Sequence, residues 1–211
     1  MSEEAVQKQK MTKKQRITLI VLASVAAFLI LAMLAGFWIM RSRFQLKYVD
    51  LIQKYSEEYN LEPTYVAAVI YTESKYRERA VSGVGARGLM QIMPNTAADI
   101  ANDLGEAFDP NRAEDLEKLY DPETSIRYGC YYLRKLLDME WADQNPAVAL
   151  AAYNGGPENA KKWLKEYKLD SSGKIAYIPY PETSNYVKRV LRAQKVYAFL
   201  YSEQLKKTTE D

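Results

Sequence analysis

One glutamate lies on the apolar side of a predicted helix. Val66, Val69, Ile70 and Glu73 follow one another at i, i+3, i+4 and i+7, so the Glu73 carboxyl group is in line with a buried stripe. Contact with apolar side chains removes water from a carboxylate and raises its pKa, which lets it hold a proton near neutral pH, as a general acid must. A glutamate at a helix end that emerges into solvent is the plainer alternative.

Composition excludes most other catalytic chemistry. The 211 residues contain no histidine and a single cysteine, Cys130. A Ser-His-Asp triad, a Cys-His pair, a His-ligated zinc site and an intramolecular disulfide are therefore impossible. Cys130 lies in a helical YGCYYL stretch and is predicted to be a small buried apolar residue.

No cofactor or metal is expected. Four aspartates near the middle of the chain lack the spacing of a calcium-binding loop; they are Asp99, Asp103, Asp109 and Asp115. The segment 81–91, VSGVGARGLMQ, has three glycines in six positions and must be a loop in which backbone can approach a ligand closely. It has neither of the glycine spacings that bind phosphate.

Three segments together resemble a known family. The first is ESKYRERAVSGVGARGLMQIMPNTA, which begins at Glu73; the second is Ala151-Ala152-Tyr153-Asn154-Gly155-Gly156; the third is PETSNYV at 181–187. In this order they resemble the signatures of the family 1 lytic transglycosylases of peptidoglycan, over a domain from about 50 to 200. The resemblance implies a lysozyme-like, mostly α-helical domain with a saccharide cleft.

The resemblance also implies a mechanism with one carboxylate. Glu73 would protonate the oxygen that links N-acetylmuramic acid to N-acetylglucosamine, and the same group would then act as a base on the muramyl C6 hydroxyl. Closure of a 1,6-anhydro ring consumes no water, so the second carboxylate of most glycosidases is not required.

Matching positions receive supporting roles from the resemblance. Tyr186 is expected to hydrogen-bond or orient Glu73, and Met90 to form an apolar wall beside it. The remaining positions are expected to line the sugar subsites; they are Ser82, Gln91, Tyr153, Asn154 and Glu182. Plainer interpretations stay open: both tyrosines can be core residues, Met90 can be ordinary packing, and an acid after Pro181 is favoured by the helix dipole alone.

Proline marks where the elements begin. Helices are predicted to start near Glu62-Pro63, Met93-Pro94, Asp121-Pro122, Asn145-Pro146, Gly156-Pro157 and Tyr180-Pro181, since proline suits a first helical turn. Amphipathic patterns occupy 46–59 and 182–204, and no convincing alternating strand is present. The predicted fold class is all-α, one lysozyme-like globular domain preceded by one transmembrane helix.

The N-terminal part predicts a membrane anchor. Residues 17–40 are uncharged and apolar, long enough to cross a bilayer of roughly 30 Å. More Lys and Arg precede this run than follow it, which favours a cytoplasmic N-terminus and an extracytoplasmic catalytic domain. The expected organisation is a basic tail at 1–16, the span at 17–40, the catalytic domain at 44–205 and a polar tail at 206–211. A signal peptide fits less well, because the run is too long.

Charge divides unevenly along the chain. The first 43 residues carry seven Lys/Arg and two Asp/Glu, a net +5, and the rest carry 22 and 25, a net −3. Such a mildly acidic domain offers no stripe for phosphates, so nucleic acid is not an expected partner. The expected partners are glycan strands of peptidoglycan and the lipid bilayer, while partners among cell-wall synthesis proteins stay open. The alternatives are a lysozyme-type hydrolase and a non-catalytic peptidoglycan-binding scaffold.

Overall fold

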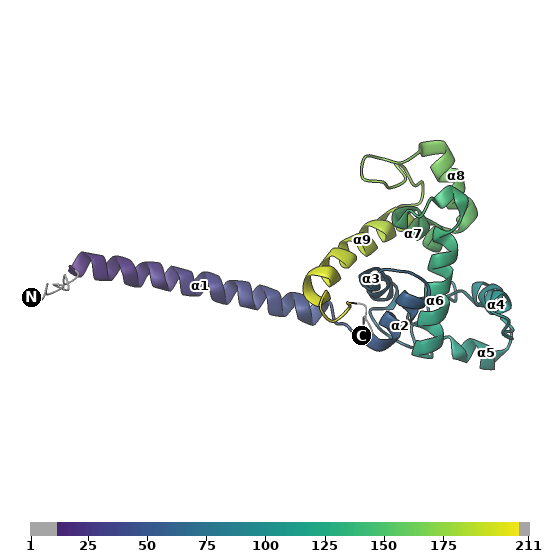
Figure 1. Ribbon diagram of the computed structural model, residues 1–211, viewed down its shortest axis with the longest axis horizontal. Coiled ribbons are helices and arrows are strands. Elements are labelled where there is room, and N and C mark those ends of the chain that lie inside the picture. Colours follow the sequence, from purple (N-terminus) through teal and green to yellow (C-terminus); the bar gives the residue numbers. More distant parts are fainter. Residues whose placement is uncertain (1–11, 207–211) are drawn as a thin grey trace, which may run out of the picture. The chain divides into compact units, whose positions relative to one another are not determined.

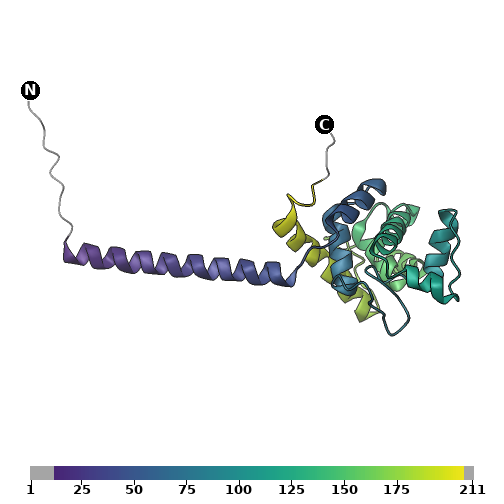
Figure 2. The same cartoon turned by 90° about the horizontal axis from the view of Figure 1, so that it is seen from below.

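The computed structural model describes residues 12–206, and the chain divides after Arg43 into two compact units. The first unit contains α1 (Lys13–Arg43), a single continuous helix in both views of Figures 1 and 2. It has no buried side chain, and an 18-residue stretch of it has a mean hydropathy of 2.8. It extends beyond the predicted 17–40 at both ends. Among the described residues it is the one helix long and apolar enough to cross a membrane.

The second unit is built from helices that begin at proline, as the sequence predicts. These are α3 (Pro63–Ser74), α4 (Pro94–Asp103), α6 (Pro122–Leu137), α7 (Pro146–Gly155), α8 (Pro157–Tyr167) and α9 (Pro181–Tyr201). Proline has no N–H to leave unpaired at a helix start, and its ring already holds the helical φ. Side chains complete two of these starts: Asp121 accepts from the Thr124 N–H at 2.8 Å, and Asn145 accepts from the Ala147 N–H at 2.9 Å.

Three elements differ from the sequence expectation. Helix α2 (Val49–Glu58) begins later than residue 46, because Tyr48 has a left-handed backbone, with φ 55°. The short α5 (Ala113–Lys118) and the 3₁₀ turn η1 (Glu140–Ala142) were not predicted. Neither has a proline at its start or enough turns to show a periodic pattern.

Helix α3 lies at the centre of the domain. Its residues Tyr65 to Ile70 are buried on every side, and α2 and α9 pack against it (Figure 1). Helix α7 in turn contacts α6, α8 and α9. The element that carries Glu73 is therefore held by the core on both sides rather than by a surface loop.

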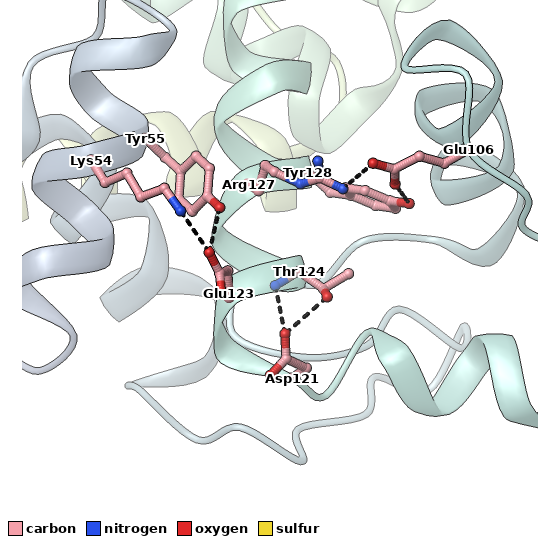
Figure 3. Close-up of polar contacts among 8 residues, drawn as sticks. All are labelled: Lys54, Tyr55, Glu106, Asp121, Glu123, Thr124, Arg127 and Tyr128. Carbon is pink, nitrogen blue, oxygen red and sulfur yellow. Dashed lines mark hydrogen bonds and ion pairs between the residues drawn. The ribbon is translucent and has the colours of Figure 1, made fainter.

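Polar contacts of α6 tie together elements from different parts of the chain (Figure 3). Glu123 accepts from the Lys54 ammonium at 2.8 Å and from the Tyr55 hydroxyl at 2.7 Å, which joins α6 to α2. Arg127 and Tyr128 both donate to Glu106, the latter at 2.8 Å, which joins α6 to the segment after α4. These contacts fix α6 as the frame on which the 81–92 loop rests.

Extended structure within residues 12–206 is limited to isolated bridges, two of them inside the glycine-rich loop and one between Leu169 and Ile175. The all-α prediction is confirmed, and so is the loop at 81–91. Cys130 is fully buried, as predicted, and so is Leu89 in the loop.

Candidate active site

A cavity of about 470 Å³ opens where α3, the 81–93 loop, α7, α8 and the start of α9 meet. Six of the residues proposed from sequence line it: Glu73, Ser82, Gln91, Tyr153, Asn154 and Glu182. These residues come from segments as much as about 110 residues apart in the chain. They are brought together because α3 packs against α9 and α7 packs against α8 and α9.

Glu73 is one residue from the C-terminal end of α3 and faces the cavity. Burial among apolar side chains raises the pKa of its carboxyl group from 4.5 to about 7. The Tyr186 hydroxyl and the Arg189 guanidinium act in the opposite direction, and the nearby Glu182 charge adds to the rise. A carboxyl group with this pKa exchanges its proton near neutral pH, as required of a group that works as both acid and base.

Tyr186 lies behind the cavity wall rather than in it. Its ring is buried on α9, and its hydroxyl has no hydrogen-bond partner of regular geometry within the described part of the chain. The interaction of this hydroxyl with Glu73 nevertheless lowers the pKa of that carboxyl group. Tyr186 is therefore placed to act on Glu73, not on a ligand.

Tyr153 and Met90 are linked by one strong contact. The Tyr153 hydroxyl donates to the Met90 carbonyl oxygen at 2.7 Å. Burial and the nearby Glu73 charge raise the pKa of Tyr153 well above its usual value, so it stays protonated. Because its hydrogen is bonded to the Met90 carbonyl oxygen, the Tyr153 hydroxyl can act towards a ligand only as a hydrogen-bond acceptor.

The Met90 side chain is not part of the cavity wall. It is fully buried, and the place of a Cβ on Gly129 of α6 would be 2.2 Å from its sulfur, so it packs directly on that glycine. Its N–H donates to the Ser125 hydroxyl at 3.2 Å. The backbone of Met90, rather than the thioether expected from sequence, is the part that reaches a cavity residue.

The glycine-rich loop is held in place where its backbone comes close to the backbone of Leu119. Gly88 has φ 78°, and a Cβ there would lie 1.9 Å from the Leu119 carbonyl oxygen, so only glycine fits. Gln91 donates through Nε2 to the carbonyl oxygens of Ala80, at 3.1 Å, and Gly88, at 2.9 Å. Because both partners are acceptors, the nitrogen must face the loop, and the Gln91 amide oxygen remains as an acceptor.

Ser82 belongs to the same loop. Its hydroxyl oxygen accepts from the Ala86 N–H at 3.0 Å, which leaves its hydrogen to donate elsewhere. Asn154, at the end of α7, and Glu182, in the first turn of α9, are both exposed on the cavity wall. The cavity thus offers donors and acceptors on opposite sides, as a polyhydroxylated ligand requires.

Sequence reasoning missed the apolar part of the wall. Val84 is 77% exposed and Met93 38%, both on the loop side. Tyr180, 58% exposed, packs on the Trp163 ring with centroids 5.5 Å apart on the other side. Exposed apolar side chains around polar groups suit the C–H faces of sugar rings. No periodic pattern marks Val84, Met93 and Tyr180, because each lies in a loop or immediately before the start of a helix.

No group of three or more His, Cys, Asp or Glu side chains that suits a metal ion occurs within residues 12–206. The chemistry that the cavity residues can supply is proton transfer by Glu73, with hydrogen bonds from the surrounding hydroxyl and amide groups.

Known proteins are similar to this chain in sequence. Residues 50–175 match the transglycosylase SLT domain family. Soluble lytic murein transglycosylase of Escherichia coli K12 is 32% identical over 167 residues, which cover 78% of this chain and 25% of that protein. Membrane-bound lytic murein transglycosylase C of Serratia proteamaculans is 32% identical over 173 residues, covering 72% of this chain and 46% of that protein.

Solved structures agree. The 70 kDa soluble lytic transglycosylase of E. coli has a TM-score of 0.68 and 32% identity, over 79% of this chain and 26% of its own. An inactive glutamate-to-glutamine mutant of lytic transglycosylase Slt from Pseudomonas aeruginosa has a TM-score of 0.67 and 30% identity, over 76% and 25%. This chain spans about a quarter of the length of these soluble relatives. By its matched residues and its fold, the protein belongs to the transglycosylase SLT domain family.

Proposed function

We propose that this protein is a membrane-anchored lytic transglycosylase of peptidoglycan. It cleaves the β-1,4 bond between N-acetylmuramic acid and N-acetylglucosamine and leaves a 1,6-anhydro end. The observation that carries the proposal is the Glu73 carboxyl group, which lines the cavity and has a pKa raised by burial to about 7. The P. aeruginosa relative described as inactive carries a glutamate-to-glutamine change, which agrees with a catalytic glutamate.

In the first step, protonated Glu73 donates its proton to the glycosidic oxygen, and the bond from that oxygen to the muramyl anomeric carbon breaks. Positive charge develops at the anomeric carbon. Tyr153 lines the cavity and its hydroxyl hydrogen is bonded to the Met90 carbonyl oxygen, so towards a ligand its oxygen can supply only lone pairs, which favour that charge.

In the second step, ionised Glu73 accepts the proton of the muramyl C6 hydroxyl, and that oxygen attacks the anomeric carbon. The anhydro ring closes, and Glu73 is protonated again, now by the C6 hydroxyl proton. The proton that it gave up in the first step stays on the 4-hydroxyl of the departing N-acetylglucosamine, so no water is consumed. Tyr186 favours the ionised form and burial favours the protonated form, so one carboxyl group serves both steps.

The test is Glu73→Gln in the full-length protein in detergent, with purified murein as substrate. Glutamine keeps the shape and removes the proton transfer, so release of anhydromuropeptides is expected to fall by about a thousandfold or more. Asp99→Asn, an exposed carboxylate outside the cavity, is the matched control and is expected to keep full activity. Full activity of Glu73→Gln contradicts the assignment.

Two other functions are separated by the products. A lysozyme-type hydrolase would release a reducing end heavier by one water than the anhydro product, which mass spectrometry resolves. A non-catalytic scaffold would bind murein and release nothing at any pH. The cavity with a titrating Glu73 favours an enzyme over the scaffold.

The proposed location is the cell membrane. Helix α1 contains a long uncharged apolar stretch and has no buried side chain, and several relatives are named membrane-bound lytic murein transglycosylases. The excess of Lys and Arg before the helix supports a cytoplasmic N-terminus, with the catalytic domain on the cell-wall side.

A further inference from the structure

A second cavity, of about 460 Å³, lies beside the segment 170–178 and the first turns of α9. Its polar lining includes Asp170, Lys174, Ser184, Asn185 and Lys188. None of these residues lines the cavity that contains Glu73, so this is a separate depression in the domain surface.

The two cavities share one wall, the N-terminal turns of α9. Glu182 and Thr183 line the Glu73 cavity. Pro181, Ser184 and Lys188 line the second cavity and follow one another at i, i+3 and i+7, which places them together on another face of the same helix. A ligand that reaches over the start of α9 can therefore occupy both.

The second cavity has an apolar floor and a firmly held rim. Ala147, Ile175 and Val187 form buried parts of the lining. The rim is closed by the Asp170 N–H, which donates to the Lys174 carbonyl at 2.7 Å, and by the Asn145 side chain, which donates to the Gly173 carbonyl at 2.8 Å. This segment is therefore shaped before any ligand arrives.

The two lysines of the lining are not held in ion pairs within residues 12–206, although, together with the hydrogen bonds from Ser172, the Lys174 charge lowers the pKa of the nearby Asp170 carboxyl group. Lys174 and Lys188 form no ion pair with any residue in the described part of the chain. Asp170 uses Oδ1 to accept from the N–H and hydroxyl of Ser172, at 2.8 and 2.6 Å, and from the Lys174 N–H at 3.2 Å. Its Oδ2 makes no hydrogen bond to a described residue.

We propose that the second cavity binds the peptide stem attached to the muramyl residue of the substrate. This inference rests on the proposed function. A stem carries free carboxylates, alanyl methyl groups and, on its third residue, an amine. The two lysines match the carboxylates, the apolar floor matches the methyl groups, and Asp170 Oδ2 matches the amine. The geometry thus assigns the second cavity to specificity rather than to catalysis.

The test uses the full-length protein with both lysines replaced, Lys174→Gln with Lys188→Gln. The substrates are murein strands with their stems and the same strands stripped of stems by an amidase. The double variant is expected to lose about tenfold in kcat/KM on stem-bearing strands and to keep its activity on stripped strands. Lys195→Gln, an exposed lysine on α9 outside both cavities, is the matched control and is expected to change neither.

A binding measurement separates the stem site from the reaction. The free stem tetrapeptide, alanyl-γ-glutamyl-lysyl-alanine, is titrated against wild type and the double variant by calorimetry; binding to wild type and about tenfold weaker binding to the variant support the site. Equal loss on both glycan substrates, or no loss on either, overturns it. If wild type releases no anhydro product but still binds the tetrapeptide through these lysines, the proposed function fails and the site remains.

Discussion

Glu73 is subject to opposing influences from its immediate surroundings. Burial near the C-terminal end of α3 and the Glu182 charge favour the protonated form, whereas Tyr186 and Arg189 favour the ionised form. The net effect is a pKa of about 7, raised by burial, rather than the 4.5 of a free glutamate. One residue can therefore lose and regain a proton within the same reaction at neutral pH.

The raised pKa predicts a stability that depends on pH. Between about 4.5 and 7 the unfolded chain releases the Glu73 proton while the folded chain, in which burial raises the pKa, keeps it, so stability falls as pH rises. Glu73→Gln lacks this penalty. It is expected to be more stable than wild type by on the order of 2 kcal/mol at pH 8 and about equal at pH 4. Urea denaturation at both pH values measures this, and a difference independent of pH would contradict it.

Two neighbours of Glu73 should move its titration in opposite directions. Tyr186→Phe removes the hydroxyl that lowers the pKa of Glu73, so the alkaline limb of kcat/KM should shift upward. Glu182→Gln removes a charge that raises this pKa, so that limb should shift downward. The check is the pH profile on solubilised murein fragments; shifts of the same sign for both variants count against this account.

The same tyrosine should matter little for folding. Because the Tyr186 hydroxyl is buried without a regular hydrogen bond, Tyr186→Phe is expected to stay within about 1 kcal/mol of wild type. Tyr153→Phe removes the 2.7 Å bond to the Met90 carbonyl and is expected to cost about 1–3 kcal/mol. Chemical denaturation of the two variants compares them, and an equal loss for both would refute the distinction.

At the scale of elements, the cavity depends on how a loop rests on a helical frame. Proline starts the helices, α6 ties α2 and the segment after α4 together, and the 81–92 loop lies against that frame. Gly88 touches the Leu119 carbonyl, and Met90 packs on Gly129. Residues that do not line the cavity, such as Gly88 and Gly129, therefore determine the positions of Gln91 and Tyr153.

Gly88→Ala tests this dependence. The added Cβ would lie 1.9 Å from backbone, at φ 78°, so a loss of about 2–4 kcal/mol in stability is expected. Gly83→Ala in the same loop is the control, since its Cβ meets nothing within 4 Å, and a change within about 0.5 kcal/mol is expected. Thermal unfolding measures both; similar losses would show that the close approach at Gly88 is unimportant.

At the scale of the whole molecule, an apolar helix with basic flanks is joined to an acidic helical domain. The first 43 residues have a net charge of +5 and the remainder −3. Under the proposed function, this helix would tether the enzyme and restrict it to glycan within reach of the membrane. The proposed activity is therefore limited in space by the same chain that carries the catalytic residue.

The tether predicts membrane retention that depends on α1. Phe28→Arg with Leu29→Arg places two charges in the middle of the helix, each costing about 3 kcal/mol in a bilayer, and should release the protein from carbonate-washed membranes. Phe28→Leu with Leu29→Ile is the apolar control and should stay in the membrane fraction. Equal retention of both pairs would contradict a role for α1 as the anchor.

Orientation has a separate test. Ser171→Cys introduces an exposed thiol in the domain, while the native Cys130 is fully buried and its thiol pKa is raised by burial, so it stays unreactive. A membrane-impermeant maleimide should label Ser171→Cys in intact spheroplasts, and wild type should remain unlabelled. Labelling of Ser171→Cys only after lysis would place the domain in the cytoplasm.

Local chemistry made much of this protein predictable from its sequence. Proline positions gave six helix starts, because proline acts through its own φ and missing N–H. The stripe that ends at Glu73 depends on neighbours within two turns, and the uncharged run at 17–40 is a property of composition. These patterns need no knowledge of distant segments.

Only the tertiary structure decided which parts of the candidate residues face the cavity. It left Met90 and Tyr186 out of the cavity lining, added Trp163 and Tyr180 to the wall, and formed a second cavity beside the first turns of α9. Each of these depends on contacts between segments far apart in the chain, such as Met90 with Gly129 or Asn145 with Gly173. The periodicity of one segment does not predict such contacts, because they form only when the helices pack together.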